Sequence, residues 1–136
     1  MEFSTKFAIV VADDLAEWKK LNVVAFLTSG VLSEDGALTG ESYRDASERT
    51  YLPLCIQPIV ILEAPREKLT TFLQRANARD ARAAIYIEDM FETGHDAANR
   101  AAVARYAAAD LPLVGIGVRS ERKLVDKILK GAKLHR

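Results

Sequence analysis

The residues best suited to chemistry gather in one short stretch, Glu88-Asp89-Met90-Phe91-Glu92-Thr93-Gly94-His95. It combines carboxylates, a hydroxyl group, a flexible glycine and one of the chain's two histidines. A carboxylate such as Asp89 can orient a water molecule or a hydroxyl group, and a histidine titrates near neutral pH. For His95, a position just before a helical pattern favours a cap or surface role over that of a base. We expect this stretch to form part of a ligand-binding or catalytic site.

Polar groups also follow the first and last apolar runs of the chain. The run Lys6–Ala12 stops at Asp13, and the run Leu113–Val118 stops at Arg119. An unbroken apolar run suits a strand buried on both faces, and functional groups of parallel sheets collect where the strands end. If the strands run the same way, Asp13 and Arg119 join Asp89 at one end of the sheet as ligand-binding groups. Asp13 could equally hold its turn by bonding to its own backbone.

The helical pattern after the first run adds two further candidates. Lys20 is an ordinary surface lysine unless the start of the helix directs it to the strand ends. Asn22 lies in an otherwise apolar segment. A buried asparagine needs partners, so Asn22 is expected to hold a neighbouring loop or to face a ligand. Asp14 and Glu17 have the spacing of a capping box, which favours a structural role for Asp14 over catalysis.

Four apolar runs alternate with four helical patterns, and this order predicts the elements that position these groups. The predicted strands are 7–12, one within 51–62, 83–88 and 113–118, and the predicted helices follow each of them, the third spanning 96–109. The fold class is therefore α/β, a three-layer α/β/α sandwich with a mostly parallel (mixed) central sheet of about four strands. We expect one domain, 1–136.

Three local patterns refine this prediction. The first helix carries apolar residues three and four apart, which predicts one buried stripe: Leu21, Val24, Ala25, Thr28, Val31 and Leu32. Residues 33–49 are polar and predict a long loop, which could include a short irregular strand. Pro53 and Pro58 remove donors from the second strand, so that strand is expected at a sheet edge or with a bulge.

Composition sets limits on the class of protein. The chain has 136 residues, 49% hydrophobic and 28% charged, which is typical of a soluble globular domain. Its single cysteine, Cys55, excludes an intramolecular disulfide. No secretion signal pattern and no long apolar span is visible, so we expect a cytoplasmic protein without membrane contact.

Charge and motif patterns narrow the partners further. The net charge is zero, which argues against strong nonspecific nucleic-acid binding, although residues 119–136 carry +5 and could form an anion-binding surface. Gly115 and Gly117 lack the third glycine of a dinucleotide fingerprint, and no Walker loop, nucleophile elbow or zinc spacing occurs. We therefore predict no cofactor and no metal site, although Asp13, Asp89 and His95 could in principle share a metal.

Several segments resemble known families. The opening 9–15 and the closing strand and helix, 113–118 and 124–134, resemble type II peptidyl-tRNA hydrolases. A fuller likeness, carried by 22–27, 53–62 and the Asp89-x-x-Glu92-Thr93 spacing, identifies the chain as a member of the uncharacterised bacterial domain-of-unknown-function family number two thousand. The resemblance implies a peptidyl-tRNA hydrolase II-like fold, and that family brings no established activity.

The resemblance to the hydrolases also implies a catalytic set of Lys20, Asp89 and Thr93. In those enzymes a lysine at the start of the first helix and an Asp-x-x-x-Thr after a strand line the active site. Lysine would stabilise a developing oxyanion and Asp89 would orient a water molecule. The hydrolases' Gly-Lys-Gly-Lys loop is here Glu17-Trp18-Lys19-Lys20, which, with zero net charge, argues against tRNA as a partner.

Three functions follow as hypotheses, and whether the protein is an enzyme stays open. The first is binding of a small anionic ligand or a partner protein at the strand ends. The alternative is hydrolysis of an ester or amide through Lys20, Asp89 and Thr93. An RNA-binding role for the basic last helix is the third. Proteins of the fold class that the chain resembles commonly form dimers, and an exposed apolar residue such as Trp18 could serve an interface. We therefore predict a homodimer.

Overall fold

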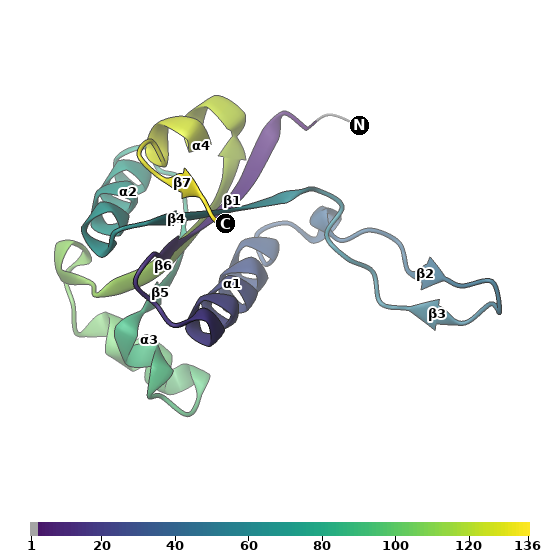
Figure 1. The fold of residues 1–136 in the computed structure, drawn as a ribbon, viewed down its shortest axis with the longest axis horizontal. Helices are drawn as coiled ribbons and strands as arrows, with labels where there is room; N and C mark the ends of the chain where they lie inside the picture. Colours follow the sequence, from purple (N-terminus) through teal and green to yellow (C-terminus); the bar gives the residue numbers. More distant parts are fainter. Residues whose placement is uncertain (1–2) are drawn as a thin grey trace.

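A five-stranded sheet in the order β5-β6-β1-β4-β7 forms the centre of the fold in the computed structural model, which describes residues 3–136 (Figure 1). The sheet is mixed and is accompanied by four α-helices within the described residues. The elements of this body are β1 (Thr5–Ala12), α1 (Glu17–Leu32), β4 (Ile59–Ala64), α2 (Arg66–Ala78), β5 (Ala84–Ile87), α3 (Asp96–Ala104), β6 (Leu113–Glu121), α4 (Arg122–Ile128) and β7 (Lys133–Leu134). The α/β class predicted from the sequence is confirmed.

The strand directions differ from the prediction. β1 is parallel to β4, but β6 is antiparallel to both β1 and β5, and β7 is antiparallel to β4. The prediction of a mostly parallel sheet is therefore wrong, and the sheet has five strands rather than about four. The segment between β5 and β6 does not return across the sheet, so β6 starts where β5 ends. β1, β4 and β5 consequently end together, whereas β6 ends at the opposite end of the sheet.

The second predicted strand also needs correction. β4 begins at Ile59, after both Pro53 and Pro58, and it lies between β1 and β7. The prolines precede the strand, so they remove no donor from its pairing with β1. The predicted edge position for this strand is wrong because β7 pairs with β4 at Leu62 and Glu63.

The long polar segment before β4 forms an arm that projects from the body (Figure 1). After a 3₁₀ turn at Gly36–Leu38, β2 (Tyr43–Arg44) pairs with β3 (Thr50–Tyr51) as an antiparallel hairpin. We refer to residues 40–56 as the arm. Every residue from 41 to 52 is exposed, so the arm is stabilised by its own turn rather than by the body.

The turn of the arm is built around Asp45. Its carboxylate accepts hydrogen bonds from the backbone N–H of Ser47 (2.8 Å) and of Arg49 (3.0 Å) and from the Tyr51 hydroxyl (2.7 Å). The hydrogen bond from Tyr51, with those from the two backbone amides, lowers the pKa of Asp45 below its ordinary value of 3.8. An aspartate that accepts hydrogen bonds from the backbone two and four residues ahead stabilises such a turn.

The packing of α1 on the sheet depends on two glycines of β6. A Cβ at Gly115 would lie 2.5 Å from Val23 Cγ1, and a Cβ at Gly117 would lie 3.1 Å from Val31 Cγ2. α1 therefore buries Val23, Leu27 and Val31. Of the predicted stripe, Val31 is buried and Val24 and Leu32 are partly buried against the core. Leu21 and Ala25 are exposed, so this part of the prediction is wrong, because the glycines select which face approaches the sheet.

Candidate functional site

A cleft of about 370 Å³ lies between α1, the end of β5 and the start of α3. Its floor includes the 3₁₀ turn Glu88–Phe91 that follows β5. The cleft brings together three of the predicted site residues, Asn22, Thr93 and His95. The full lining consists of Trp18, Asn22, Phe26, Tyr86, Met90, Phe91, Thr93, Gly94, His95, Asp96 and Asn99.

Four aromatic rings form one wall of the cleft. Ring centroids are 6.1 Å apart for Trp18 and Phe91, 5.2 Å for Phe91 and Tyr86, and 5.9 Å for Tyr86 and Phe26. The Lys19 ammonium lies 4.7 Å from the Phe91 ring centroid and 5.6 Å from that of Trp18. Such rings offer faces for a planar group, and the ammonium adds a positive charge beside them.

Hydrogen-bonding groups form the rest of the cleft. The Tyr86 hydroxyl donates to Asn22 Oδ1 at 3.4 Å, and burial raises the pKa of Tyr86. Asn22 is exposed, so the prediction that it is buried is wrong, because the helix turns it away from the sheet. Thr93 Oγ1 contacts Asn99 Oδ1 and the Met90 carbonyl oxygen.

His95 caps the N-terminus of α3, as its sequence position favoured. Its Nδ1 accepts a hydrogen bond from the Ala98 N–H at 3.2 Å. A neutral imidazole with Nδ1 as acceptor carries its proton on Nε2. Because the side chain is exposed and lines the cleft, Nε2 can donate to a bound molecule.

Asp89 and Lys20 lie outside the cleft lining and have different partners. Asp89 accepts hydrogen bonds from the Tyr106 hydroxyl at 3.0 Å and from Arg105 at 3.3 Å. The hydrogen bond to Asp89 raises the pKa of Tyr106. The Lys20 ammonium lies 3.7 Å from a carboxylate oxygen of Glu63. Asp89 thus binds the residues at the C-terminal end of α3, and the ion pair of Lys20 with Glu63 links α1 to β4.

A charge network occupies the shared ends of β1, β4 and β5. Arg66 Nε donates to Asp14 at 2.9 Å, and its Nη1 donates to Glu88 at 2.8 Å. Asp14 is therefore not a helix cap: Ala16 occupies the N-cap position before α1, and no side chain caps the helix there. Asp13 shares this end of the sheet with Asp89, as predicted, but its exposed side chain makes no hydrogen bond or ion pair to residues 3–136.

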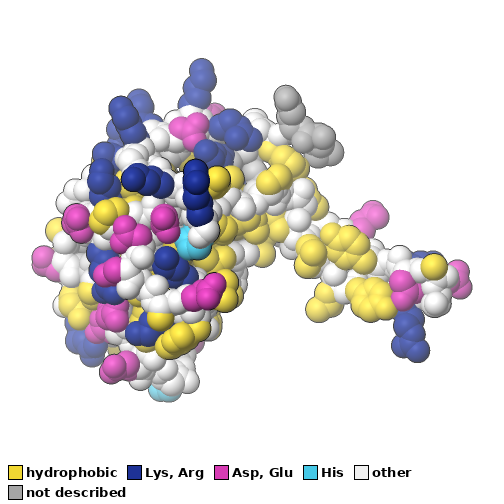
Figure 2. All heavy atoms as spheres, viewed as in Figure 1, with side chains coloured by type: hydrophobic (Ala, Val, Ile, Leu, Met, Phe, Trp, Pro, Cys, Tyr) yellow, Lys and Arg dark blue, Asp and Glu magenta, His cyan; other side chains and the backbone are white. Residues whose placement is uncertain are grey.

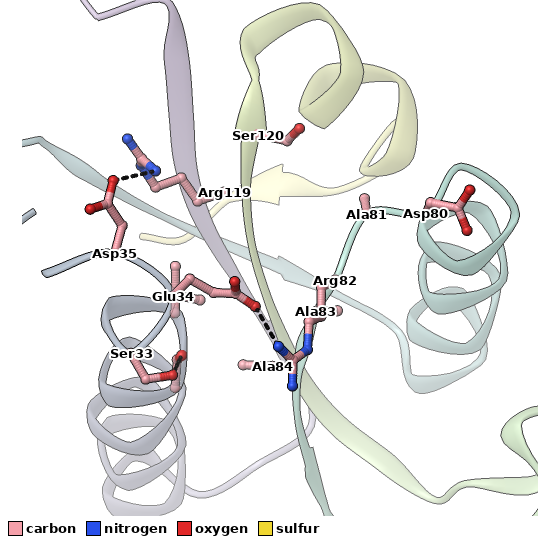
Figure 3. Close-up of a pocket in the computed structure, with 12 residues that line it drawn as sticks. Ser33, Glu34, Asp35, Asp80, Ala81, Arg82, Ala83, Ala84, Arg119 and Ser120 are labelled. Carbon is pink, nitrogen blue, oxygen red and sulfur yellow. Dashed lines mark hydrogen bonds and ion pairs between the residues drawn. The ribbon is translucent and has the colours of Figure 1, made fainter. Parts of the chain in front are cut away.

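Arg119 lies at the opposite end of the sheet because β6 is antiparallel to β1. The predicted grouping of Arg119 with Asp13 and Asp89 is therefore wrong. Figure 3 shows Arg119 in a second cavity, of about 530 Å³, beside Asp35 and the ion pair of Arg82 with Glu34. Arg119 Nη1 is 3.9 Å from Asp35, so carboxylates already compensate both cations.

The sequence did not identify Glu63, Arg66 and Tyr106 as partners of the charged residues near the cleft, where they contact Lys20, Asp14 and Asp89 respectively. Each comes from an element whose neighbours only the tertiary fold defines, and the position of Glu63 just before the end of β4 was the one available signal. Among residues 3–136, no three His, Cys, Asp or Glu side chains are grouped to hold a metal ion. Within the same residues, no helix combines the length and apolar character needed to cross a membrane.

Comparison with known proteins places the chain in a family. The sequence model described as "Protein of unknown function (DUF2000)" matches residues 5–136. The chain belongs to the DUF2000 family. This confirms the family predicted from the sequence, whereas the link to peptidyl-tRNA hydrolases stays a prediction.

A solved structure shares the fold of this DUF2000 member. It is described as a protein of unknown function from Agrobacterium tumefaciens strain C58, with 49% sequence identity and a TM-score of 0.97. The similarity covers 99% of this chain and 100% of that chain. Comparison with curated proteins gave no match. Neither description carries an activity, so function must be argued from the cleft.

Proposed function

We propose that this DUF2000 protein binds a small, planar, anionic ligand in the cleft between α1 and α3. The observation that carries the proposal is the continuous aromatic wall with the Lys19 ammonium beside it. A cavity of about 370 Å³ falls within the range of small-molecule sites. The ligand's ring would stack on Phe91 and Trp18, with its anionic group directed to Lys19.

The charges around the cleft favour an anion over a cation. Lys19 has no carboxylate partner within residues 3–136, so its charge is free to pair with a ligand. Asp96 is the one acidic side chain in the lining, and Arg100 pairs with it. The Nε2 proton of His95 supplies a further donor in the cleft lining.

Polar groups that line the cleft would fix the ligand's orientation. Asn22 and Asn99 each present an amide, which can donate and accept hydrogen bonds. Thr93 adds a hydroxyl group to the same lining, next to Asn99. A few convergent polar groups on an otherwise aromatic surface are typical of sites that select a small ligand by shape and hydrogen bonding.

Hydrolysis through Lys20, Asp89 and Thr93 is the weaker candidate. Of the three, Thr93 alone lines the cleft, while Lys20 and Asp89 are engaged with Glu63 and Tyr106. An ester panel assayed with the wild-type protein and with Asp89→Asn tests this alternative. Turnover that Asp89→Asn abolishes without lowering the melting temperature would favour hydrolysis over binding.

Trp18 provides a direct assay because it is the only tryptophan in the chain and it lines the cleft. The protein would be titrated with aromatic carboxylates and nucleoside monophosphates while its fluorescence is recorded. We expect a saturable change, and Lys19→Met should weaken binding of anions about tenfold, which corresponds to roughly 1.4 kcal/mol.

The matched control is Lys127→Met, which removes a lysine from the exposed side of α4. It changes the net charge by the same amount as Lys19→Met, but Lys127 lies on α4, whereas the Lys19 ammonium lies beside the Trp18 and Phe91 rings of the cleft wall. Equal weakening by both variants would mean that overall charge, not the cleft, attracts the ligand. Failure of every anion in the panel to give a saturable change would reject the proposed function.

A further inference from the structure

Helix α1 carries apolar side chains on two faces. One face, Val23, Leu27 and Val31, is buried against the sheet. The other, which we call the outer face, consists of Leu21 and Ala25, both exposed, with Leu21 66% accessible. A surface helix normally has one apolar stripe, and a helix that is apolar on both sides is typically buried in a larger assembly.

The arm has the same character. Its exposed apolar side chains are Tyr43, Tyr51, Leu52, Leu54 and Ile56, with Leu52 85% and Leu54 65% accessible. A lone two-stranded hairpin is marginally stable in water, so an arm with these side chains needs a surface to lie on. Asp45 already fixes its turn, which means that little further ordering is needed when it docks.

We propose that each arm lies along the outer face of α1 in a second copy of this chain, forming an arm-exchanged homodimer. The two surfaces match in length: α1 has 16 residues and spans about 24 Å, and the arm runs out and back over 40–56, about 26 Å each way. α1 ends at Leu32, close in sequence to the base of the arm.

Two-fold symmetry lets one arrangement cover both apolar surfaces. Each copy carries an arm and an outer face. A two-fold rotation therefore places both arms on the outer faces of the opposite copies, so that neither apolar surface stays exposed. Figure 2 shows hydrophobic side chains along the arm and on the side of the body where α1 lies. A different partner protein would have to supply two unrelated complementary surfaces.

The apolar area is sufficient for a stable dimer. Half-exposed aromatic and aliphatic side chains of this size each present roughly 100 Å² to solvent, so the five arm residues present about 500 Å². Two arms together with the surfaces that they cover would bury about 2,000 Å² in total, which is in the range of homodimer interfaces.

The first test is the mass of the full-length protein in solution, by light scattering at micromolar concentrations. We expect twice the 15.0 kDa chain mass. Leu52→Glu with Leu54→Glu in the arm, and separately Leu21→Glu on α1, should each restore the single-chain mass with an unchanged circular dichroism spectrum. Leu134→Glu on β7 is the matched control, since Leu134 is 63% exposed but belongs to neither surface, and it should leave the dimer intact.

Cross-linking tests the arm-to-helix contact itself. In a Cys55→Ser background, one preparation carries Leu52→Cys and the other carries Leu21→Cys. Mixing and oxidation should give a disulfide-linked pair containing one chain of each kind. A monomeric wild-type protein, a dimer that survives the arm and α1 substitutions, or cross-links only between two Leu52→Cys chains would each overturn the proposal.

Discussion

Replacing Gly115 by alanine tests how α1 is held against the sheet. The new Cβ would lie 2.5 Å from Val23 Cγ1, 2.9 Å from Leu27 Cδ1 and 3.3 Å from the Val10 carbonyl oxygen. Val23 and Leu27 are buried, and a valine in a helix has one strongly preferred side-chain rotamer. The side chain therefore cannot rotate away, and the helix backbone itself must move.

The magnitude follows from two opposing terms. Over-packing a core costs about 1–3 kcal/mol, whereas the smaller conformational freedom of unfolded alanine recovers about 0.4–1 kcal/mol. We expect a net loss of about 1–2 kcal/mol in the free energy of unfolding, which is a fall of roughly 3–8 °C in the melting temperature. Thermal unfolding followed by circular dichroism measures this loss.

Two further glycines calibrate the result. Gly117→Ala places its Cβ 3.1 Å from Val31 Cγ2 and should cost less than Gly115→Ala. Gly36→Ala meets no atom within 4 Å and should be neutral or slightly stabilising. If Gly115→Ala unfolds at the same temperature as Gly36→Ala, the inference that these glycines set the position of α1 is wrong.

Further predictions concern buried and bonded polar groups. Gln57 is buried and its side chain makes three hydrogen bonds, so Gln57→Ala should lower the free energy of unfolding by about 1–3 kcal/mol in a urea titration. Asp89→Ala should return the raised pKa of Tyr106 toward 10.0, as followed by ultraviolet absorbance. The pKa of Asp45 is lowered in the folded protein, so the stabilisation that Asp45 gives the arm is present above pH 3.8 and is lost as the pH falls through the lowered pKa. The pKa of Tyr51 is raised, so the hydrogen bond between Tyr51 and Asp45 is retained up to at least pH 10.0. The protection of the arm amides, measured as their exchange rate relative to the intrinsic rate at each pH, should therefore fall in acid, and unchanged protection in Asp45→Ala at neutral pH would contradict this role.

Several elements could be predicted from local patterns alone. The apolar runs give β1 and most of β6, because burial on both faces excludes polar residues from both strands. In α2 the apolar residues at the spacing of the helical repeat are the ones that are buried: Leu69, Phe72, Leu73 and Ala76. Within the cleft, Thr93 and His95 were predicted because polar and titratable residues directly follow a short apolar strand.

Other features have no local signal. An apolar run reports that a strand is buried but not which way it points, so the position of Arg119 depended on whether the chain returned across the sheet before β6. The buried face of α1 was likewise decided by glycines almost a hundred residues away in β6. The arm could not be predicted as a unit, because its first part has the polar character of a loop and its second part, from Tyr51 on, has the apolar character of a buried strand.

The sequence by itself thus determined the family, the α/β class and the residues available to a site. The tertiary structure decided which of them meet: it joined Asn22 to Thr93 and His95, separated Arg119 from them, and gave Asp89 and Lys20 other partners. The physical reason is that burial and helical periodicity are local properties of the chain. Strand direction and helix placement arise from contacts between segments far apart in sequence.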